Sequence, residues 1–114
     1  MAELIKNVEH AKPFNVADYI VMEKGKANSI SLSQTPGTKM TLFAIDEGEG
    51  MSTHAASGDA MAFILEGTAR ITIDDVPHEV SGGEAIILPC GVPHAVLALT
   101  PFKMLLTVVK AVDE

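Results

Sequence analysis

Glycine and proline interrupt the apolar segments of this chain at short intervals, and this punctuation restricts the possible folds more than any other feature. The 114 residues include nine glycines and six prolines. The segments between them are too short to form stable isolated helices. Ile30 and Leu32, for example, lie two positions apart, as on one face of a strand. The sequence therefore predicts an all-β fold that needs no long helix.

About eight or more short strands follow from this pattern. Turn residues separate them, including a hairpin tip near Asp74 and Asp75. So many short strands without an internal repeat predict a sandwich or a barrel. The expected strands cover residues 28–35, 38–46, 61–67, 68–74, 74–80, 85–89, 94–99 and 103–111.

Two segments allow more than one interpretation. Residues 16–22 suit either a short helix or a first strand. Residues 58–67 contain good helix formers behind Asp59, which could act as an N-cap. The segment is short and its neighbours resemble strands, so we expect a strand that pairs with residues 68–74 around Gly67.

The class of protein follows from length, charge and cysteine content. Residues 1–114 have the length of one domain. The net charge of −7 and the lack of a basic patch argue against nucleic-acid partners. No apolar run approaches the roughly 20 residues that span a membrane, and the N-terminus lacks a secretory signal pattern. The lone Cys90 cannot form an internal disulfide, which agrees with a cytoplasmic protein. From these features together we expect a cytoplasmic protein without a membrane partner.

Glycine, proline and histidine recur at fixed offsets in two stretches, of which the second reads "GGEAIILPCGVPHA". The positions are Gly48, His54 and Gly67 in the first stretch, and Gly83, Pro89, Gly91 and His94 in the second. This spacing resembles the two sequence motifs of the cupin superfamily, over about 48–67 and 83–98. With the flanking strands, the resemblance covers nearly the whole chain.

The resemblance implies a double-stranded β-helix, or jelly-roll barrel, that usually forms a homodimer. It also implies a metal site with three histidines and one glutamate as protein ligands. His54 and His94 match the first and last histidine, whereas Ala56 and Ala60 occupy the other two positions. Two histidines alone would hold a divalent metal (Zn, Mn, Fe, Ni or Cu) only weakly, so no cofactor is assigned.

Three further residues near these histidines are candidate ligand contacts. Asp59 would replace the expected glutamate only if a bulge turned it inward, because adjacent strand residues face opposite sides. Met61 ends the segment 52–61, which is expected to line one side of the barrel mouth. Cys90 could form a thiolate–imidazole pair with His94, but no third group is seen to orient the histidine, so a structural role at the turn is favoured.

Three functions remain open from the sequence, and so does the question of enzymatic activity. The first is binding of a small molecule at the barrel mouth near His54 and His94, which the loss of two metal ligands favours. The second is a metal-dependent enzyme of oxygenase or isomerase type with non-standard ligands. The third is a structural or interaction protein with a packed barrel. A polar cavity that holds both histidines would support the first two, and a filled barrel would support the third.

Overall fold

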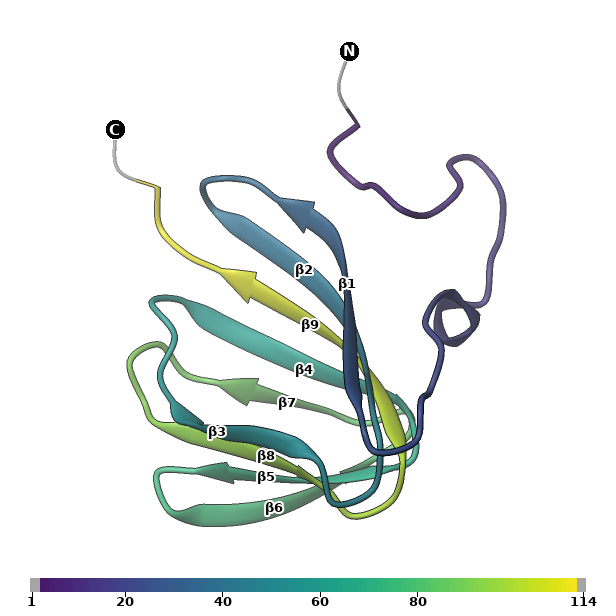
Figure 1. Ribbon diagram of the computed structural model, residues 1–114. Helices are drawn as coiled ribbons and strands as arrows, with labels where there is room; N and C mark the ends of the chain where they lie inside the picture. The colour runs from purple at the N-terminus through teal and green to yellow at the C-terminus, as the bar shows by residue number, and fades with distance from the viewer. Residues whose placement is uncertain (1–2, 113–114) are drawn as a thin grey trace.

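The computed structural model describes residues 3–112 and shows an all-β sandwich of two sheets, which confirms the expected fold class (Figure 1). One sheet has the strand order β1-β2-β9-β4-β7, and the other has the order β3-β8-β5-β6. All neighbouring strands are antiparallel. The elements in the described residues are η1 (Val16–Tyr19), β1 (Ala27–Gln34), β2 (Thr38–Ile45), β3 (Gly50–His54), β4 (Asp59–Glu66), β5 (Thr68–Ile73), β6 (Val76–Ser81), β7 (Ala85–Leu88), β8 (His94–Ala98) and β9 (Phe102–Val109).

The consecutive strands β4 and β5 lie in different sheets, so the expected pairing around Gly67 is wrong. Strand β4 pairs with β7 and β9, whereas β5 pairs with β6 and β8. The chain crosses between the sheets at Gly67, where φ is +81°. A Cβ atom there would overlap the carbonyl oxygen of Pro101, so the crossing requires glycine for space as well as for conformation.

The ambiguous segments resolve into one short helix and one strand. Residues 16–19 form the 3₁₀ helix η1, and the segment behind Asp59 is strand β4. Asp74 and Asp75 form the tip of the β5–β6 hairpin with φ values of +48° and +66°, as a two-residue turn with matching twist requires. Strand β3 was not expected as a separate element, because its residues lack strand-like apolar alternation.

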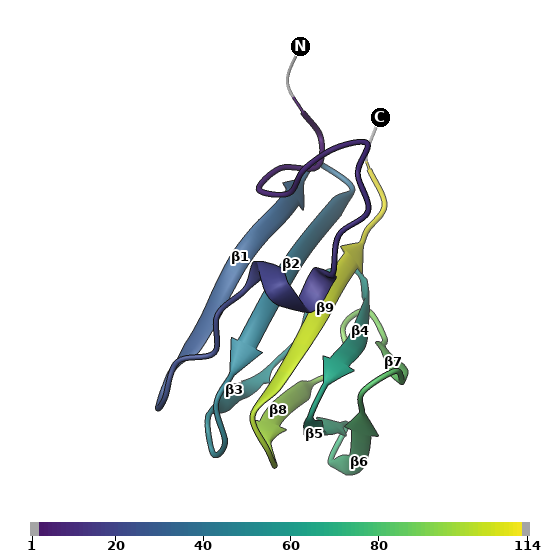
Figure 2. The ribbon, with the colours of Figure 1, turned by 90° about the vertical axis from the view of Figure 1, so that its right-hand side faces the viewer.

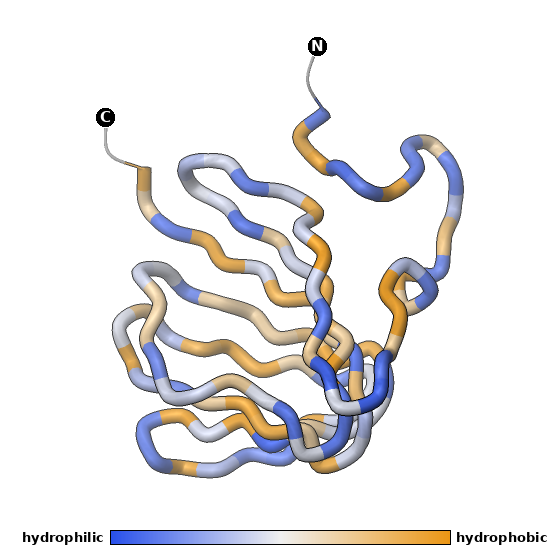
Figure 3. Tube along the Cα trace, in the orientation of Figure 1, coloured by the Kyte–Doolittle hydropathy of each residue, from blue (hydrophilic) through white to orange (hydrophobic). Residues whose placement is uncertain are grey.

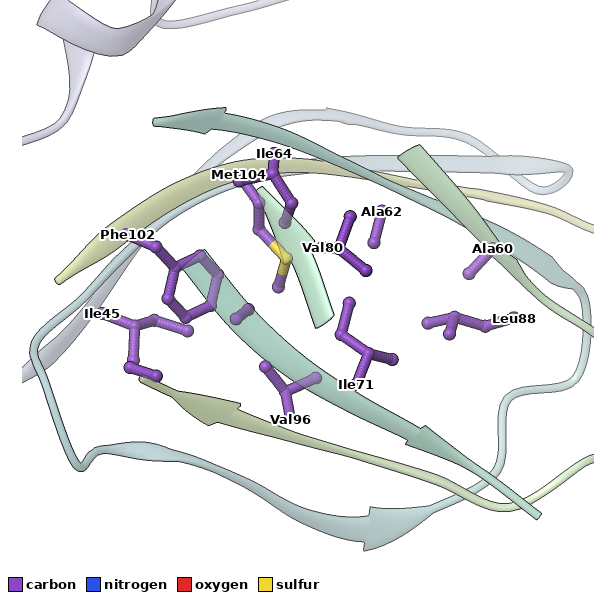
Figure 4. Packing of buried hydrophobic residues seen from close by; sticks show 12 residues of the cluster. Ile45, Ala60, Ala62, Ile64, Ile71, Val80, Leu88, Val96, Phe102 and Met104 are labelled. Carbon is purple, nitrogen blue, oxygen red and sulfur yellow. The ribbon is translucent and has the colours of Figure 1, made fainter. Parts of the chain in front are cut away.

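The main core fills the space between the sheets near the end where the chain crosses at Gly67. Figure 4 shows Phe102 and Met104 of β9 pointing toward Ile71 and Val96 of the opposite sheet. Phe102 and Ile71 have no exposed surface (0%), and Met104 has 1%. Figure 1 shows the two sheets converging toward this end. Large side chains therefore close one end of the sandwich, and space between the sheets remains at the other.

The segment before β1 covers part of the outer face of the five-stranded sheet (Figure 2). Ile20 packs there with Leu32, Leu42 and Ala44 in a second buried cluster. The ammonium of Lys103 on β9 donates a hydrogen bond to the carbonyl oxygen of Ala17 at 2.7 Å. Figure 3 shows hydrophobic residues in η1 and in the strands beside it, and hydrophilic residues along the β5–β6 tip.

Candidate functional site

A cavity of about 220 Å³ lies between the two sheets, toward the end away from Phe102. Strands β2, β4 and β9 contribute one wall, and β3 and β8 contribute the other. We name it the histidine cavity. Its lining residues are Lys39, Thr41, Phe43, Met51, His54, Ala56, Ala60, His94, Leu106 and Val108.

Strand alternation explains why one wall carries these side chains. Lys39, Thr41 and Phe43 occupy every second position of β2, so they share its inner face. In the β2–β9 ladder Lys39 pairs with Val108, and Thr41 pairs with Leu106. Directly opposed residues in a ladder have their side chains on the same side of the sheet. The wall therefore has the polar residues Lys39 and Thr41 toward its outer end and the apolar Phe43 deeper inside.

His54 and His94 lie side by side on the opposite wall. They are register partners at the last residue of β3 and the first of β8, and their ring centroids are 4.4 Å apart with planes at 69°. His94 is buried, with 5% of its surface exposed, whereas His54 is exposed at the mouth. The structure thus brings together the two histidines that the sequence predicted as a pair.

Backbone carbonyl groups orient both imidazole rings. Nδ1 of His54 donates to the carbonyl oxygen of Ser52 at 2.8 Å, and Nδ1 of His94 donates to that of Val92 at 3.3 Å. A neutral ring that donates from Nδ1 carries its lone pair on Nε2. Each neutral histidine therefore keeps Nε2 available as a hydrogen-bond acceptor or a metal ligand.

Burial lowers the pKa of His94, because the charged imidazolium is poorly solvated beneath the surface. The neighbouring His54 lowers this pKa further, and the hydrogen bond to the Val92 carbonyl acts in the opposite direction. Because the ordinary pKa of histidine is about 6.5, His94 is neutral at pH 7. The cavity therefore presents an uncharged buried base beside an accessible histidine.

We expect acid to destabilise the fold through His94. Since folding lowers its pKa, the unfolded chain binds more protons once the pH falls below about 6.5. The stabilising contribution is complete above that pH and is lost between it and the lowered folded-state pKa. Urea unfolding at about pH 7.5 and about pH 5.5 should show a larger loss of unfolding free energy for wild type than for His94→Gln. The exposed His78→Gln is the control, and equal losses in wild type and His94→Gln would contradict the expectation.

The residues of the cavity do not fit a metal centre with three or four protein ligands. Ala56 and Ala60 line the cavity where the cupin resemblance expects a histidine and a glutamate, and a methyl group has no lone pair to donate. Among residues 3–112, no three or more His, Cys, Asp or Glu side chains are grouped so that they could hold a metal ion. Zinc sites usually have at least three protein ligands, and here only His54 and His94 supply donors of that kind.

The other three candidate residues lie outside the cavity lining. Met61 is 42% exposed on the outer face of β4, because its neighbours Ala60 and Ala62 take the inner face. Asp59 accepts a hydrogen bond from the backbone N–H of Cys90 at 2.8 Å. Cys90 itself is exposed. Asp59 thus fixes the turn before β8, and its carboxylate is not turned toward the two histidines by a bulge.

Sequence reasoning missed the residues of the opposite wall. Lys39, Thr41 and Phe43 share one face of a strand that was expected, so their alternation was visible. The sequence did not show that this face lies across from the histidine pair, because that placement depends on the strand order of the two sheets. Met51 was missed because strand β3 was not expected.

Two other hollows differ from the histidine cavity in their chemistry. A larger open groove of about 630 Å³ has no titratable side chain, because its lining consists of residues 13–17 and Leu65. A hollow of about 350 Å³ shares Lys39, Ala56 and Val108 with the histidine cavity, and we name it the vestibule. Its remaining lining residues are Gln34, Thr35, Thr38, Ala55, Ser57 and Lys110. We assign the site to the cavity and the vestibule, since the histidine pair and two lysines line them.

No helix within residues 3–112 has the length and apolar character needed to cross a membrane. A comparison with curated proteins finds no match to the sequence.

Solved structures and a sequence family resemble this chain closely. A conserved protein of unknown function from Streptococcus pyogenes is 38% identical, covers 98% of both chains and superposes with a TM-score of 0.95. A cupin superfamily protein from Desulfitobacterium hafniense is 28% identical over 94% of this chain and 98% of its own, with a TM-score of 0.89. A cupin 2 conserved barrel domain protein from Leptotrichia buccalis is 40% identical over 85% of this chain and 47% of its own, with a TM-score of 0.83. The Cupin domain family matches residues 41–109, which is more than half of the sequence. The chain therefore belongs to the cupin family, as the spacing of its glycines, prolines and histidines indicated.

Proposed function

We propose that this cupin binds a small organic molecule in the histidine cavity and does not catalyse its conversion. The observation that supports the proposal is the pair of imidazole rings at the edge of a cavity that is otherwise mainly apolar. Their ring centroids are 4.4 Å apart. Apolar walls with a few convergent polar groups are typical of small-molecule sites. The volume of the histidine cavity is about 220 Å³, below the roughly 300–1,000 Å³ common for drug-sized ligands, so the part of the ligand inside the cavity is small.

Binding is favoured over catalysis because the cavity lacks a reactive set of groups. The exposed Cys90 does not line it, and no carboxylate in residues 3–112 lines it either. Its protein groups therefore offer no nucleophile with a positioned base and no acid–base pair of carboxylates. The two histidines can accept hydrogen bonds from a ligand and orient it.

Two methionines provide an internal control for a binding experiment. Met51 lines the histidine cavity, whereas Met61 lies on the outer face of the same sandwich. A set of small neutral, cationic and anionic organic molecules is added to protein with ¹³C-labelled methionine methyl groups and labelled histidine rings. We expect the binding compounds to shift the signals of Met51, His54 and His94 and to leave Met61 in place. If compounds that bind shift only Met61, or if none shifts Met51, the proposal fails.

We also propose that the chain forms a homodimer through the outer face of β4 and β7. Met61 and Ile87 are register partners on that face and are 42% and 52% exposed. Val109, at the end of the adjacent strand β9, is 57% exposed. The N-terminal segment covers the outer face of β1 and β2 but leaves this apolar patch at the β7 edge. A two-fold axis would bury the patch against its own copy.

Light scattering tests the dimer directly. We expect twice the mass of one chain for wild type and the mass of one chain for the double variant Met61→Lys and Ile87→Lys, because charges in the interface would have to be desolvated. Val76→Lys is the matched control, since Val76 is 54% exposed at the start of β6, away from the patch. A monomeric wild-type protein would refute this part of the proposal.

A further inference from the structure

The histidine cavity and the vestibule have positive and neutral groups but no acidic ones. Lys39 lines both hollows, and Lys110 lines the vestibule. No aspartate or glutamate of residues 3–112 is part of either lining. The whole chain has 15 acidic residues and 8 lysines and arginines, so an average surface would show the opposite balance. The entrance is therefore a local exception to the charge of the protein, and an anion would be attracted to it.

Lys39 is placed to meet a ligand at the outer end of the cavity. It lies on the inner face of β2, beside Val108, and its side chain is exposed. Within the part of the chain that the structure describes, its ammonium forms no ion pair. By comparison, Lys26, Lys12 and Lys103 each lie within 4 Å of a glutamate. A carboxylate that enters the cavity would therefore meet an ammonium that is not already paired with a carboxylate of the described residues.

The two histidines on the opposite wall favour a hydrogen-bond donor on the ligand, whereas Lys39 favours a carboxylate. Nδ1 of both rings already donates to a carbonyl, so a neutral ring offers only the acceptor Nε2. A carboxylate has no proton to donate to such an acceptor, whereas a hydroxyl group does. Between these polar groups lie the apolar side chains of Phe43, Met51 and Leu106. The cavity volume of about 220 Å³ favours a small ligand body.

We infer that the ligand class is a small hydroxycarboxylate, with its carboxylate at Lys39, its hydroxyl at the histidine pair and a short apolar body against Phe43 and Leu106. This inference rests on the proposed binding function and specifies the chemistry of the same site. Lys39 and the histidines lie on opposite walls, so a molecule that engages both must carry its carboxylate and its hydroxyl at opposite ends.

Three probes with the same unbranched four-carbon skeleton test the two halves of the inference. They are 4-hydroxybutyrate, its amide 4-hydroxybutyramide, and butyrate, which lacks the hydroxyl group. Dissociation constants are measured from the Met51 methyl signal for wild type, Lys39→Met and Lys12→Met. Lys12 is an exposed lysine on the N-terminal segment and serves as the matched control.

We expect wild type to bind the hydroxy acid about fivefold more tightly than either the amide or butyrate, which is the size of one partly exposed charge or hydrogen-bond contact. Lys39→Met should remove the preference for acid over amide, and Lys12→Met should keep it. If the amide binds as tightly as the acid, or Lys39→Met retains the preference, the inference is wrong although cavity binding stands. If butyrate equals the hydroxy acid, the hydroxyl contact is wrong. If none of the three shifts Met51, the ligand class is wrong, and the broader compound set decides whether the cavity binds organic molecules at all.

Discussion

Replacing Gly67 with alanine should lower the free energy of unfolding by about 2–5 kcal/mol. About 1–2 kcal/mol comes from holding a residue with a Cβ in the left-handed region, and about 1–3 kcal/mol comes from displacing packed neighbours. The backbone at this residue has φ of +81°. The added Cβ would overlap the carbonyl oxygen of Pro101 and would lie 2.7 Å from Cα of Phe102. Because Phe102 is fully buried, the overlap cannot be relieved without moving the core.

Gly83→Ala separates the two causes of this loss. Gly83 also has a positive φ, of +91°, but a Cβ there would meet no atom within 4 Å. Gly83→Ala should therefore lower the free energy of unfolding only by the conformational contribution, about 1–2 kcal/mol. Urea unfolding of both variants under the same conditions gives the two values. Equal losses at the two positions would show that the crossing at Gly67 has room for a side chain, contrary to the packing described.

Ala60→Leu should abolish ligand binding while the protein stays folded. Ala60 is 2% exposed, faces the histidine cavity and pairs with Val108 and Leu88 on either side. Three added carbon atoms would occupy the space that a ligand needs in a cavity of about 220 Å³. We expect the affinity for any compound that shifts Met51 to fall at least 20-fold. Stability should stay the same or rise by about 0.5–2 kcal/mol, because filling a void adds apolar contacts.

Ala27→Leu is the matched control for this experiment. Ala27 is exposed at the start of β1 and lines neither the histidine cavity nor the vestibule. The same chemical change there should leave binding unaltered. Calorimetric titration of both variants gives the comparison, with thermal unfolding to show that each is folded. Undiminished binding by Ala60→Leu would place the ligand outside the histidine cavity.

Local patterns in the sequence predicted most of the strands and the histidine pair. The Asp74–Asp75 tip was identified because two-residue hairpin turns need residues that accept positive φ. His54 and His94 could be paired across 40 positions only because the spacing resembled two cupin motifs, and the structure brings their rings together. The family match over residues 41–109 and the similar solved structures confirm family membership and the jelly-roll fold.

The errors arose where tertiary structure overrides local order. Strands that are adjacent in sequence often pair with each other. No sequence feature near Gly67 indicated that the chain crosses there into the other sheet. Met61 was expected at the cavity because its neighbours are there, but a shift of one residue along a strand reverses the direction of a side chain. Lys39 was not considered because the strand that carries it lies far from both motifs in sequence. The cytoplasmic location stays a prediction from the N-terminal sequence.

A crystal structure with a compound from the binding screen would locate the ligand site. We expect the compound between the two walls of the histidine cavity, in contact with His94, Met51 and Leu106. Its polar groups should lie near Nε2 of the histidines and near the Lys39 ammonium. A compound bound instead in the open groove beside Phe14 and Leu65, with the histidine cavity left without it, would contradict the assignment of the site.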